Sequence, residues 1–233
     1  GEGWRVIAST RHAKKIKHGA VKSNRFELII RDISDIKAIE DKLTQIQQTG
    51  VPNYFGPQRF GIAGQNIVKA EQMLLGERRV KDRFLKGMYF SSARSYLFNQ
   101  ILSARVEQAC WQEALPGDVV QLSGSQSFFH VDVSDETIAE RILKKDISPA
   151  SVLWGKAKNN LVSADALLIQ SKALTGLEPL CHALEQHDLS RAYRAHRLDV
   201  EELSCAWDNN LLKLSFTLVS GGYATSVLRE LFS

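Results

Sequence analysis

Cysteine is scarce in this sequence, which contains only three among its 233 residues. They are Cys110, Cys181 and Cys205, an odd number at wide spacing, each surrounded by apolar residues. Such a set forms neither a disulfide framework nor the close ligand cluster of a structural zinc site. We therefore expect three reduced core cysteines and no structural metal.

Long apolar runs are also missing, since no stretch approaches the roughly 18 residues that a membrane helix needs. The first residues do not combine a basic region with an apolar stretch and a cleavage site, as a signal peptide does. Hydrophobic residues make up 44% of the chain and charged residues 24%, which is typical of a globular protein with one large core or two smaller ones. The sequence predicts a soluble, cytoplasmic protein with no membrane partner.

Motifs for nucleotide cofactors and metals are lacking as well. Gly221 and Gly222 are too short a pattern for a phosphate-binding loop. His182 and His187 lie near Cys181, but neighbouring positions on a helix point in different directions and no ligand motif is present. The sequence therefore favours neither a metal centre nor a cysteine nucleophile there.

Positive charge is modest in total but concentrated in one segment. The net charge is +4, yet residues 11–25 contain no acidic residue at all. The basic residues of this segment are Arg11, His12, Lys14, Lys15, Lys17, His18, Lys22 and Arg25. Such a concentration attracts phosphates and gives salt-dependent binding. The segment predicts either an RNA-binding surface or an ordinary solvated face.

Apolar periodicity predicts alternating strands and helices. Residues 26–30 alternate as a strand with one face fully buried and the other partly buried. A helix follows, capped by Ser34 or Asp35 and ended by Gly50 in a left-handed conformation. Further helices are expected over 67–74, 92–111, after a cap at Ser134, over 164–189 and over 224–231, with strands over 119–122, 128–133, 203–207 and 212–218. Residues 76–87 are strongly charged and are expected to be an exposed crossing.

The segment 51–61 is an unusual loop. It contains two prolines and two glycines, which exclude a regular helix and a central strand, together with three aromatic residues, two amides and an arginine. In one interpretation Tyr54, Phe55 and Phe60 anchor the loop to the core. In the other, an aromatic ring stacks on an extruded base, Asn53 or Gln58 contacts the base edge, and Arg59 meets a phosphate or carboxylate.

Residues 53–61 follow the pattern Asn-Tyr-Phe-Gly-x-Gln-Arg-Phe-Gly, which closely resembles the signature loop of the TruD family of pseudouridine synthases. Residues 11–26 are similar to the family's basic strand, with Ser23 where the family usually has glycine. Residues 92–100 and 222–230 also match family segments in the expected order. The resemblance spans nearly the whole chain and is weakest over residues 79–200.

The resemblance implies an α+β fold in which a pseudouridine synthase-like mixed or antiparallel sheet with flanking helices carries an inserted α+β domain. The catalytic domain would comprise residues 1–78 and 201–233, and the insertion domain residues 79–200. The implied activity is isomerisation of uridine 13 of tRNA without metal or cofactor. The uracil leaves its stack, detaches with the help of an aspartate, rotates, and is rejoined through a carbon–carbon bond.

The resemblance also assigns site residues. Asn53 and Tyr223 would hold the target nucleotide, and Phe55 would shape the pocket; Tyr223 replaces what is often phenylalanine. The residues expected to contact tRNA are Arg11, His12, Lys14, Lys15, Lys17, Lys22 and Arg59.

The catalytic aspartate is the residue that this sequence does not match. The family places it in a Gly-x-Lys-Asp motif upstream of the basic strand, and the 233 residues contain no such motif. Lys81-Asp82 and Lys145-Asp146 lie downstream of the loop and lack the flanking residues. We therefore expect no catalytic residue in this chain and a nucleophilic aspartate upstream of Gly1.

Two further expectations follow from the missing motif. The partner of this chain would be the missing N-terminal segment of the same protein, and the chain alone would show no turnover. The alternative is a noncatalytic binder or chaperone of structured RNA that has kept the pocket without the nucleophile.

Overall fold

The computed structural model describes residues 9–11, 21–131, 135–157 and 161–233. The strands are β1 (Ser23–Ile30), β2 (Val51–Pro52), β3 (Val119–Leu122), β4 (Phe128–His130), β5 (Ile147–Leu153), β6 (Ala192–Ala195), β7 (Arg197–Leu198), β8 (Glu201–Asp208) and β9 (Leu211–Val219). The helices are α1 (Ile36–Thr49), η1 (Pro57–Phe60), η2 (Ile62–Gly64), α2 (Gln65–Leu74), α3 (Arg83–Glu107), α4 (Thr137–Leu143), α5 (Ala164–Ala173), α6 (Glu178–Glu185) and α7 (Ala224–Leu231).

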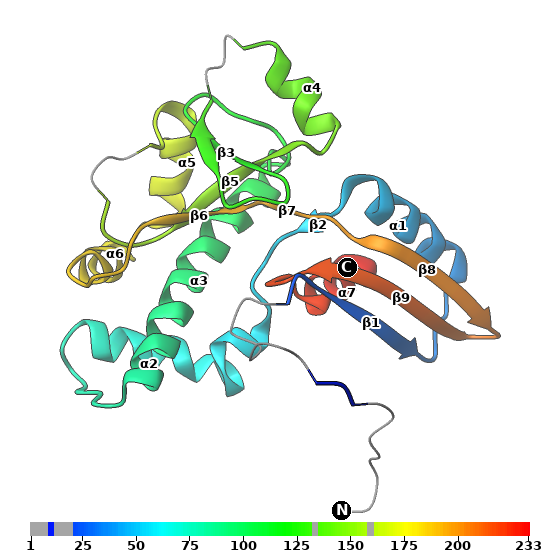
Figure 1. The fold of residues 1–233 in the computed structure, drawn as a ribbon, viewed down its shortest axis with the longest axis horizontal. Coiled ribbons are helices and arrows are strands. Elements are labelled where there is room, and N and C mark those ends of the chain that lie inside the picture. The colour runs from blue at the N-terminus through cyan, green and yellow to red at the C-terminus, as the bar shows by residue number, and fades with distance from the viewer. Residues whose placement is uncertain (1–8, 12–20, 132–134, 158–160) are drawn as a thin grey trace, which may run out of the picture.

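The strands form three sheets, with the orders β1-β9-β8, β2-β7 and β4-β3-β5-β6. All neighbouring strands within these sheets are antiparallel. The predicted α+β class, with antiparallel sheets and flanking helices, is confirmed. Figure 1 shows the first and last sheets in separate parts of the molecule, with β2 and β7 crossing between them.

Each part has its own apolar core. One core joins α1 and α7 to the β1-β9-β8 sheet, and the other joins α2, α3, α5 and α6 to β5 and β6. Ala70 of α2 belongs to the second core, so the chain enters this part before residue 79. The domain boundaries at 78 and 201 stay a prediction.

The two predicted C-terminal strands form and pair as a hairpin. β8 and β9 pair across a turn in which Asn209 has a φ of +51°, a conformation that asparagine tolerates better than most residues. Leu212, Leu214 and Phe216 on β9 are almost fully buried beneath the helices. Cys205 on β8 is exposed, so the expectation of three core cysteines is wrong for this one. The remaining two are buried.

The first strand is less buried than predicted. Phe26, Leu28 and Ile30 are half-buried, and Ile29 on the other face is 56% exposed. The reason is position, because β1 is at an edge of its sheet in the described part of the chain and has one neighbour, β9. Phe26 still stacks on Phe216 with ring centroids 5.5 Å apart.

The start and end of α1 follow the predicted chemistry. Asp35 is the N-cap, and its Oδ1 accepts a hydrogen bond of 2.9 Å from the backbone nitrogen of Ala38. Gly50 ends the helix with a φ of +70°. The alternative cap, Ser34, is exposed and outside this bond.

We expect Asp35→Ala to lower the free energy of unfolding by about 1 kcal/mol, because the first turn loses a hydrogen bond to one of its unpaired backbone N–H groups. Ser34→Ala is the matched control and should leave stability within about 0.5 kcal/mol. Urea denaturation followed by circular dichroism measures both. Equal losses in the two variants would show that Asp35 is not the stabilising cap.

The middle of the chain contains the largest departures from prediction. The long helix α3 begins at Arg83, not at residue 92, because Asp82 caps it with a bond from Leu85 N to Asp82 Oδ1 of 3.0 Å. Its first turns are exposed, so the exposure predicted for residues 76–87 holds except at Val80, which is buried, although part of that segment is helical. The helix ends at Glu107, earlier than the predicted residue 111.

Strand β5 is absent from the sequence prediction. It lies between β3 and β6 with nearly all of its residues buried on both faces, so no alternation marks it. Pro149 lies inside it, and the Pro149 carbonyl accepts a 2.8 Å bond from His196 N. The helix α4 begins after Glu136, which makes no side-chain cap bond; the predicted cap, Ser134, lies outside the described residues.

Candidate functional site

The loop at 51–61 is held between α3 and α7. The side chain of Asn99 on α3 donates to the carbonyl of Phe55 at 3.0 Å and accepts from its backbone nitrogen at 2.9 Å. Ser226 on α7 donates to the carbonyl of Tyr54 at 3.0 Å, and the guanidinium of Arg229 lies 4.7 Å from the Tyr54 ring centre. Tyr54 is buried, so the anchoring interpretation is correct for this ring.

Gly56 brings the loop close to the start of α7. A Cβ atom at this position would lie 2.4 Å from Thr225 Oγ1 and 2.8 Å from Tyr223 Cδ1. Its φ is −71°, so the requirement for glycine is steric and not conformational. This close approach places the loop against the residue before α7, which is Tyr223.

Phe55 lies at the centre of an aromatic cluster. It makes edge-type contacts with Phe98, at a centroid distance of 5.6 Å, and with Tyr223, at 5.9 Å. Two guanidinium groups lie against its ring, with Arg194 at 4.1 Å and Arg59 at 5.5 Å from the ring centre. The structure thus brings three of the predicted residues, Phe55, Arg59 and Tyr223, into one group.

The Tyr223 hydroxyl has a partner that the sequence did not reveal. It accepts a 2.9 Å bond from Arg59 Nε, while Arg59 NH1 donates to Ser91 Oγ at 2.9 Å. Ser92 Oγ donates to the Arg59 carbonyl at 2.9 Å. Arg59 is therefore fixed from both sides, by the residue before α7 and by α3.

Asn53 is 8% exposed and directs its amide inward. Its Nδ2 donates to Ala195 O at 3.0 Å, its Oδ1 accepts from Arg194 NH2, and its carbonyl accepts from Arg194 Nε at 3.1 Å. Its backbone nitrogen donates to His196 O at 2.7 Å. Asn53 lies beside the other predicted residues, and in this arrangement its amide orients Arg194.

Arg194 is the residue of this group that the sequence analysis missed. It lies on β6, and its NH2 also donates to Gly221 O at 2.9 Å. Burial lowers the pKa of its guanidinium to about 10, the Tyr223 phenol opposes this change, and the positive charge of Arg59 adds to it. No motif marked it, because its link to the loop is made by β6 and joins residues 141 positions apart.

A buried polar network surrounds His196, the residue between β6 and β7. His196 Nε2 lies 2.6 Å from Ser151 Oγ, and its Nδ1 lies 3.2 Å from Trp111 O. Complete burial lowers the His196 pKa to about 3, with a further contribution from the charge of Arg105. Arg105 NH2 makes an ion pair with Asp118 Oδ1, and both side chains are 2% exposed. Burial raises the pKa of the Asp118 carboxyl, and Arg105 opposes that rise.

The basic segment is described only at its ends. Arg11 and Lys22 are exposed, while the predicted contacts His12, Lys14, Lys15 and Lys17 lie outside the described residues. The carbonyl of Lys22 accepts a 2.8 Å bond from Ser220 N, next to the Gly221 carbonyl that binds Arg194. The described end of the basic segment at Lys22 therefore lies close to Arg194.

The expected position of the nucleophile is not tested by the structure. The aspartate is expected upstream of Gly1, and Gly1 itself lies outside the described residues, which begin at residue 9. An aspartate upstream of Gly1 stays a prediction.

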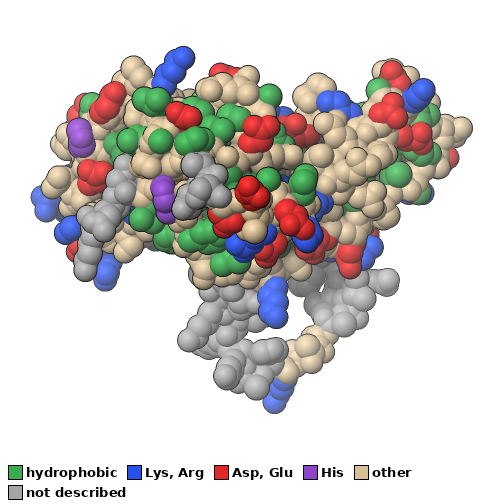
Figure 2. Space-filling view, turned by 90° about the horizontal axis from the view of Figure 1, so that it is seen from above, with side chains coloured by type: hydrophobic (Ala, Val, Ile, Leu, Met, Phe, Trp, Pro, Cys, Tyr) green, Lys and Arg blue, Asp and Glu red, His purple; other side chains and the backbone are tan. Residues whose placement is uncertain are grey.

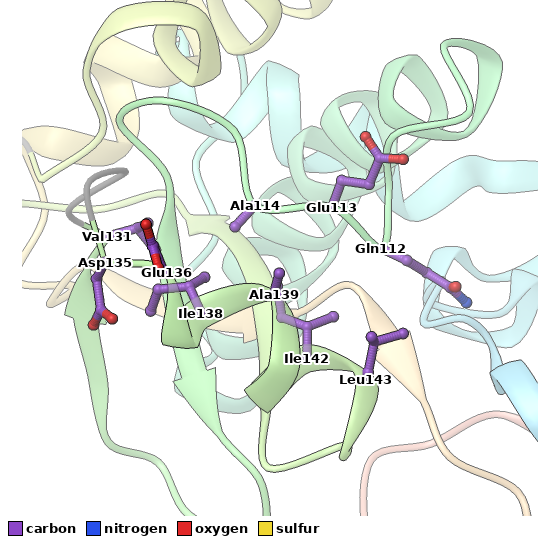
Figure 3. A pocket seen from close by; sticks show the side chains of 10 residues that line it. All are labelled: Gln112, Glu113, Ala114, Val131, Asp135, Glu136, Ile138, Ala139, Ile142 and Leu143. Carbon is purple, nitrogen blue, oxygen red and sulfur yellow. The ribbon is translucent and has the colours of Figure 1, made fainter.

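Other parts of the described chain contain no stronger candidate for a functional site. No group of three or more His, Cys, Asp or Glu residues in that part could hold a metal ion. Within the same residues, no helix is both long enough and apolar enough to cross a membrane. A cavity of about 430 Å³ lies beside α4, lined largely by apolar side chains such as Ile138 and Ile142 (Figure 3), and contains none of the predicted site residues. On the face shown in Figure 2, acidic, basic and apolar side chains are interspersed.

Known proteins resemble this chain over most of its length. The family tRNA pseudouridine synthase D (TruD) matches residues 2–79 and 65–231. The tRNA pseudouridine synthase D of Legionella pneumophila (strain Corby) is 48% identical over 230 residues, which are 98% of this chain and 68% of the relative. That of Colwellia psychrerythraea is 41% identical and is covered over 65% of its length. The chain thus spans about two thirds of these relatives.

A crystal structure of a Methanosarcina mazei protein assigned to TruD superposes with a TM-score of 0.64 over 97% of this chain and 72% of that one. Its sequence identity is 20%, so this likeness supports the fold alone. The assignment to a family therefore rests on the family match and the two relatives. This chain belongs to the tRNA pseudouridine synthase D (TruD) family.

Proposed function

We propose that this chain is the substrate-binding body of a cytoplasmic pseudouridine synthase that isomerises uridine 13 of tRNA. The observation that supports this proposal is a cluster of side chains around the loop at 51–61. It contains two aromatic rings and two arginines, namely Phe55, Tyr223, Arg59 and Arg194. An extruded base needs an aromatic surface, and the phosphates beside it need cations. Both are present in one place.

In this proposal each residue has a defined task. Tyr223 stacks on the uracil or its neighbour, and Phe55 closes the side of the pocket. Asn53 holds the target nucleotide through its amide, which exchanges one of its internal bonds for a bond to the base. The remaining bonds of Asn53 keep the loop in place.

The nucleophile is proposed to come from a segment outside these 233 residues. The aspartates of both Lys-Asp pairs have structural partners, since Asp82 caps α3 and Asp146 Oδ2 accepts from Arg141 Nε at 2.7 Å. Asp35 caps α1 and Asp118 pairs with buried Arg105. A carboxylate that acts on the ribose must be free to reach it, and these four are engaged elsewhere.

Product mapping tests the proposed function. tRNA is incubated with the chain joined to a segment that carries the Gly-x-Lys-Asp motif, and pseudouridine is located by carbodiimide labelling and primer extension. We expect one new stop, corresponding to position 13. A stop at another uridine would overturn the proposed position, and tight binding with no stop would favour the noncatalytic RNA binder.

The basic segment is expected to supply phosphate contacts. Replacing Lys14, Lys15 and Lys17 together with alanine should weaken tRNA binding and flatten its dependence on salt by about 0.7–0.9 in log–log slope for each lost contact. Filter binding at several salt concentrations measures both quantities. The matched control replaces Lys37, Lys144 and Lys172 with alanine, which removes the same charge elsewhere. Equal effects of the two triple variants would show that the segment has no special role.

A further inference from the structure

Arg194 and Arg59 form a pair of cations without an acidic partner in the described part of the chain. The ion pairs found there include neither residue. The partners of Arg194 are the carbonyl and amide oxygens of Asn53 and the carbonyl of Gly221. Those of Arg59 are the hydroxyls of Tyr223 and Ser91. All of these acceptors are neutral.

Each guanidinium also keeps one nitrogen for another ligand. Arg194 uses Nε and NH2, and Arg59 uses Nε and NH1. Within the described residues, NH1 of Arg194 and NH2 of Arg59 make no hydrogen bond. Neither belongs to the buried polar atoms that lack a partner, so both remain open to an incoming group.

The arrangement is unfavourable until an anion arrives. Two like charges lie near one ring, with Arg194 4.1 Å and Arg59 5.5 Å from the centre of Phe55, and both side chains are half-buried. Burial of a cation without a counter-charge costs free energy, which agrees with the lowered pKa of Arg194. The positions of both groups are nevertheless fixed by several hydrogen bonds. A fixed, uncompensated pair of forks is suited to an oxyanion, because bidentate arginine contacts match phosphate geometry.

We infer that Arg194, together with Arg59, binds a phosphodiester group of the RNA strand next to the extruded nucleotide. This inference rests on the proposed function and adds a phosphate site to the base site. A nucleotide presents a base and a phosphate within one short unit, and here Phe55 and Tyr223 lie directly beside the two arginines. A single phosphodiester offers two oxygens to the two forks. Asn53 is then a positioning residue for Arg194 as well as a base contact.

A cycle between protein and RNA variants tests this inference. Two neutral RNAs are prepared by ligating synthetic pieces of tRNA: one carries a methylphosphonate on the 5′ side of uridine 13, and the other carries it on the 3′ side. In each neutral RNA and in its phosphodiester reference, the adjacent 2′-hydroxyl is replaced by hydrogen. Dissociation constants are measured for the unchanged chain and for Arg194→Gln. With the phosphodiester RNA, Arg194→Gln should weaken binding about 10–100-fold. With one of the two neutral RNAs, the same substitution should change affinity less than about threefold.

Control variants separate a phosphate contact from a loss of structure. Arg141→Gln removes another arginine that lies against a ring, that of Phe129 at 5.5 Å, but is paired with Asp146; it should leave binding to every RNA unchanged. Arg194→Lys keeps the charge and should recover part of the affinity. If Arg194→Gln weakened binding to all RNAs by the same factor, Arg194 would only support the loop or bind a protein carboxylate, and the inference would be wrong. Failure of the chain to bind any tRNA would instead contradict the proposed function.

Discussion

Replacing Asp118 with alanine is expected to lower the free energy of unfolding by about 3–5 kcal/mol, the largest stability effect that we predict. The substitution leaves Arg105 as a charge in the core, 2% exposed. Among the described residues, its Nε and NH1 lack hydrogen-bond partners and its ion pair is with Asp118, so the substitution removes its counter-charge there. The Asp118 side chain also accepts a 2.8 Å bond from Leu115 N, which ties the turn before β3 to α3. Urea denaturation followed by tryptophan fluorescence measures the loss.

The double variant Arg105→Met, Asp118→Leu separates the ion pair from the packing around it. Removal of both charges should recover much of the lost stability, because a buried ion pair is often no better than apolar residues of similar size. If Asp118→Ala cost less than about 1 kcal/mol, water or another group would have to neutralise Arg105. The assignment of Asp118 as the essential counter-charge of Arg105 would then be wrong.

Tyr223→Ala is expected to reduce kcat/KM for tRNA on the order of 100-fold in the active, reconstituted enzyme. Two contributions add, namely stacking on a base, worth about 1–3 kcal/mol, and the hydrogen bond that holds Arg59, worth about 1.5–3 kcal/mol for a charged donor. Tyr223→Phe keeps the ring and loses only the bond to Arg59 Nε. A reduction of about tenfold is expected for it, larger than the resemblance alone would suggest.

Steady-state kinetics on both variants tests this assignment. A much larger effect of alanine than of phenylalanine supports stacking by the ring. Equal effects would show that the hydroxyl, through Arg59, carries the whole contribution. No effect of either variant would remove Tyr223 from the site.

Local chemistry made parts of the fold predictable. The α1 cap at Asp35, its end at Gly50 and the hairpin turn at Asn209 are properties of a few neighbouring residues, and all three appear in the structure. Strand β5 could not be found in this way, because burial on both faces removes the alternation. The exposure of Ile29 and Cys205 follows from their positions on the outer strands of the sheet. A periodic sequence pattern does not reveal the order of strands in a sheet.

The candidate site, like the fold, could be predicted from the sequence only in part. The loop at 53–61 was identifiable because its composition is unusual and resembles one family. Arg194 was not, since an isolated arginine in a β-strand has many ordinary explanations and its partners, Asn53 and Gly221, are distant in sequence. The partner of the Tyr223 hydroxyl could not be predicted either, because its bond to Arg59 joins residues 164 positions apart.

The proposed origin of the nucleophile agrees with the open edges of the first sheet. Within the described residues, β1 and β8 are the outer strands of the order β1-β9-β8, and an unpaired edge strand can accept a further strand. A segment that carries the aspartate could add to either edge.

The most direct test of the central claim is tritium release from tRNA labelled at C5 of uracil. The assay is run with this chain alone and with the chain joined to a segment that carries the Gly-x-Lys-Asp motif. We predict release only in the second case, and its loss when the aspartate of that motif is replaced by asparagine. Release by the chain alone at a comparable rate would place the nucleophile among its own aspartates. No release in either case would contradict the claim that this pocket forms pseudouridine.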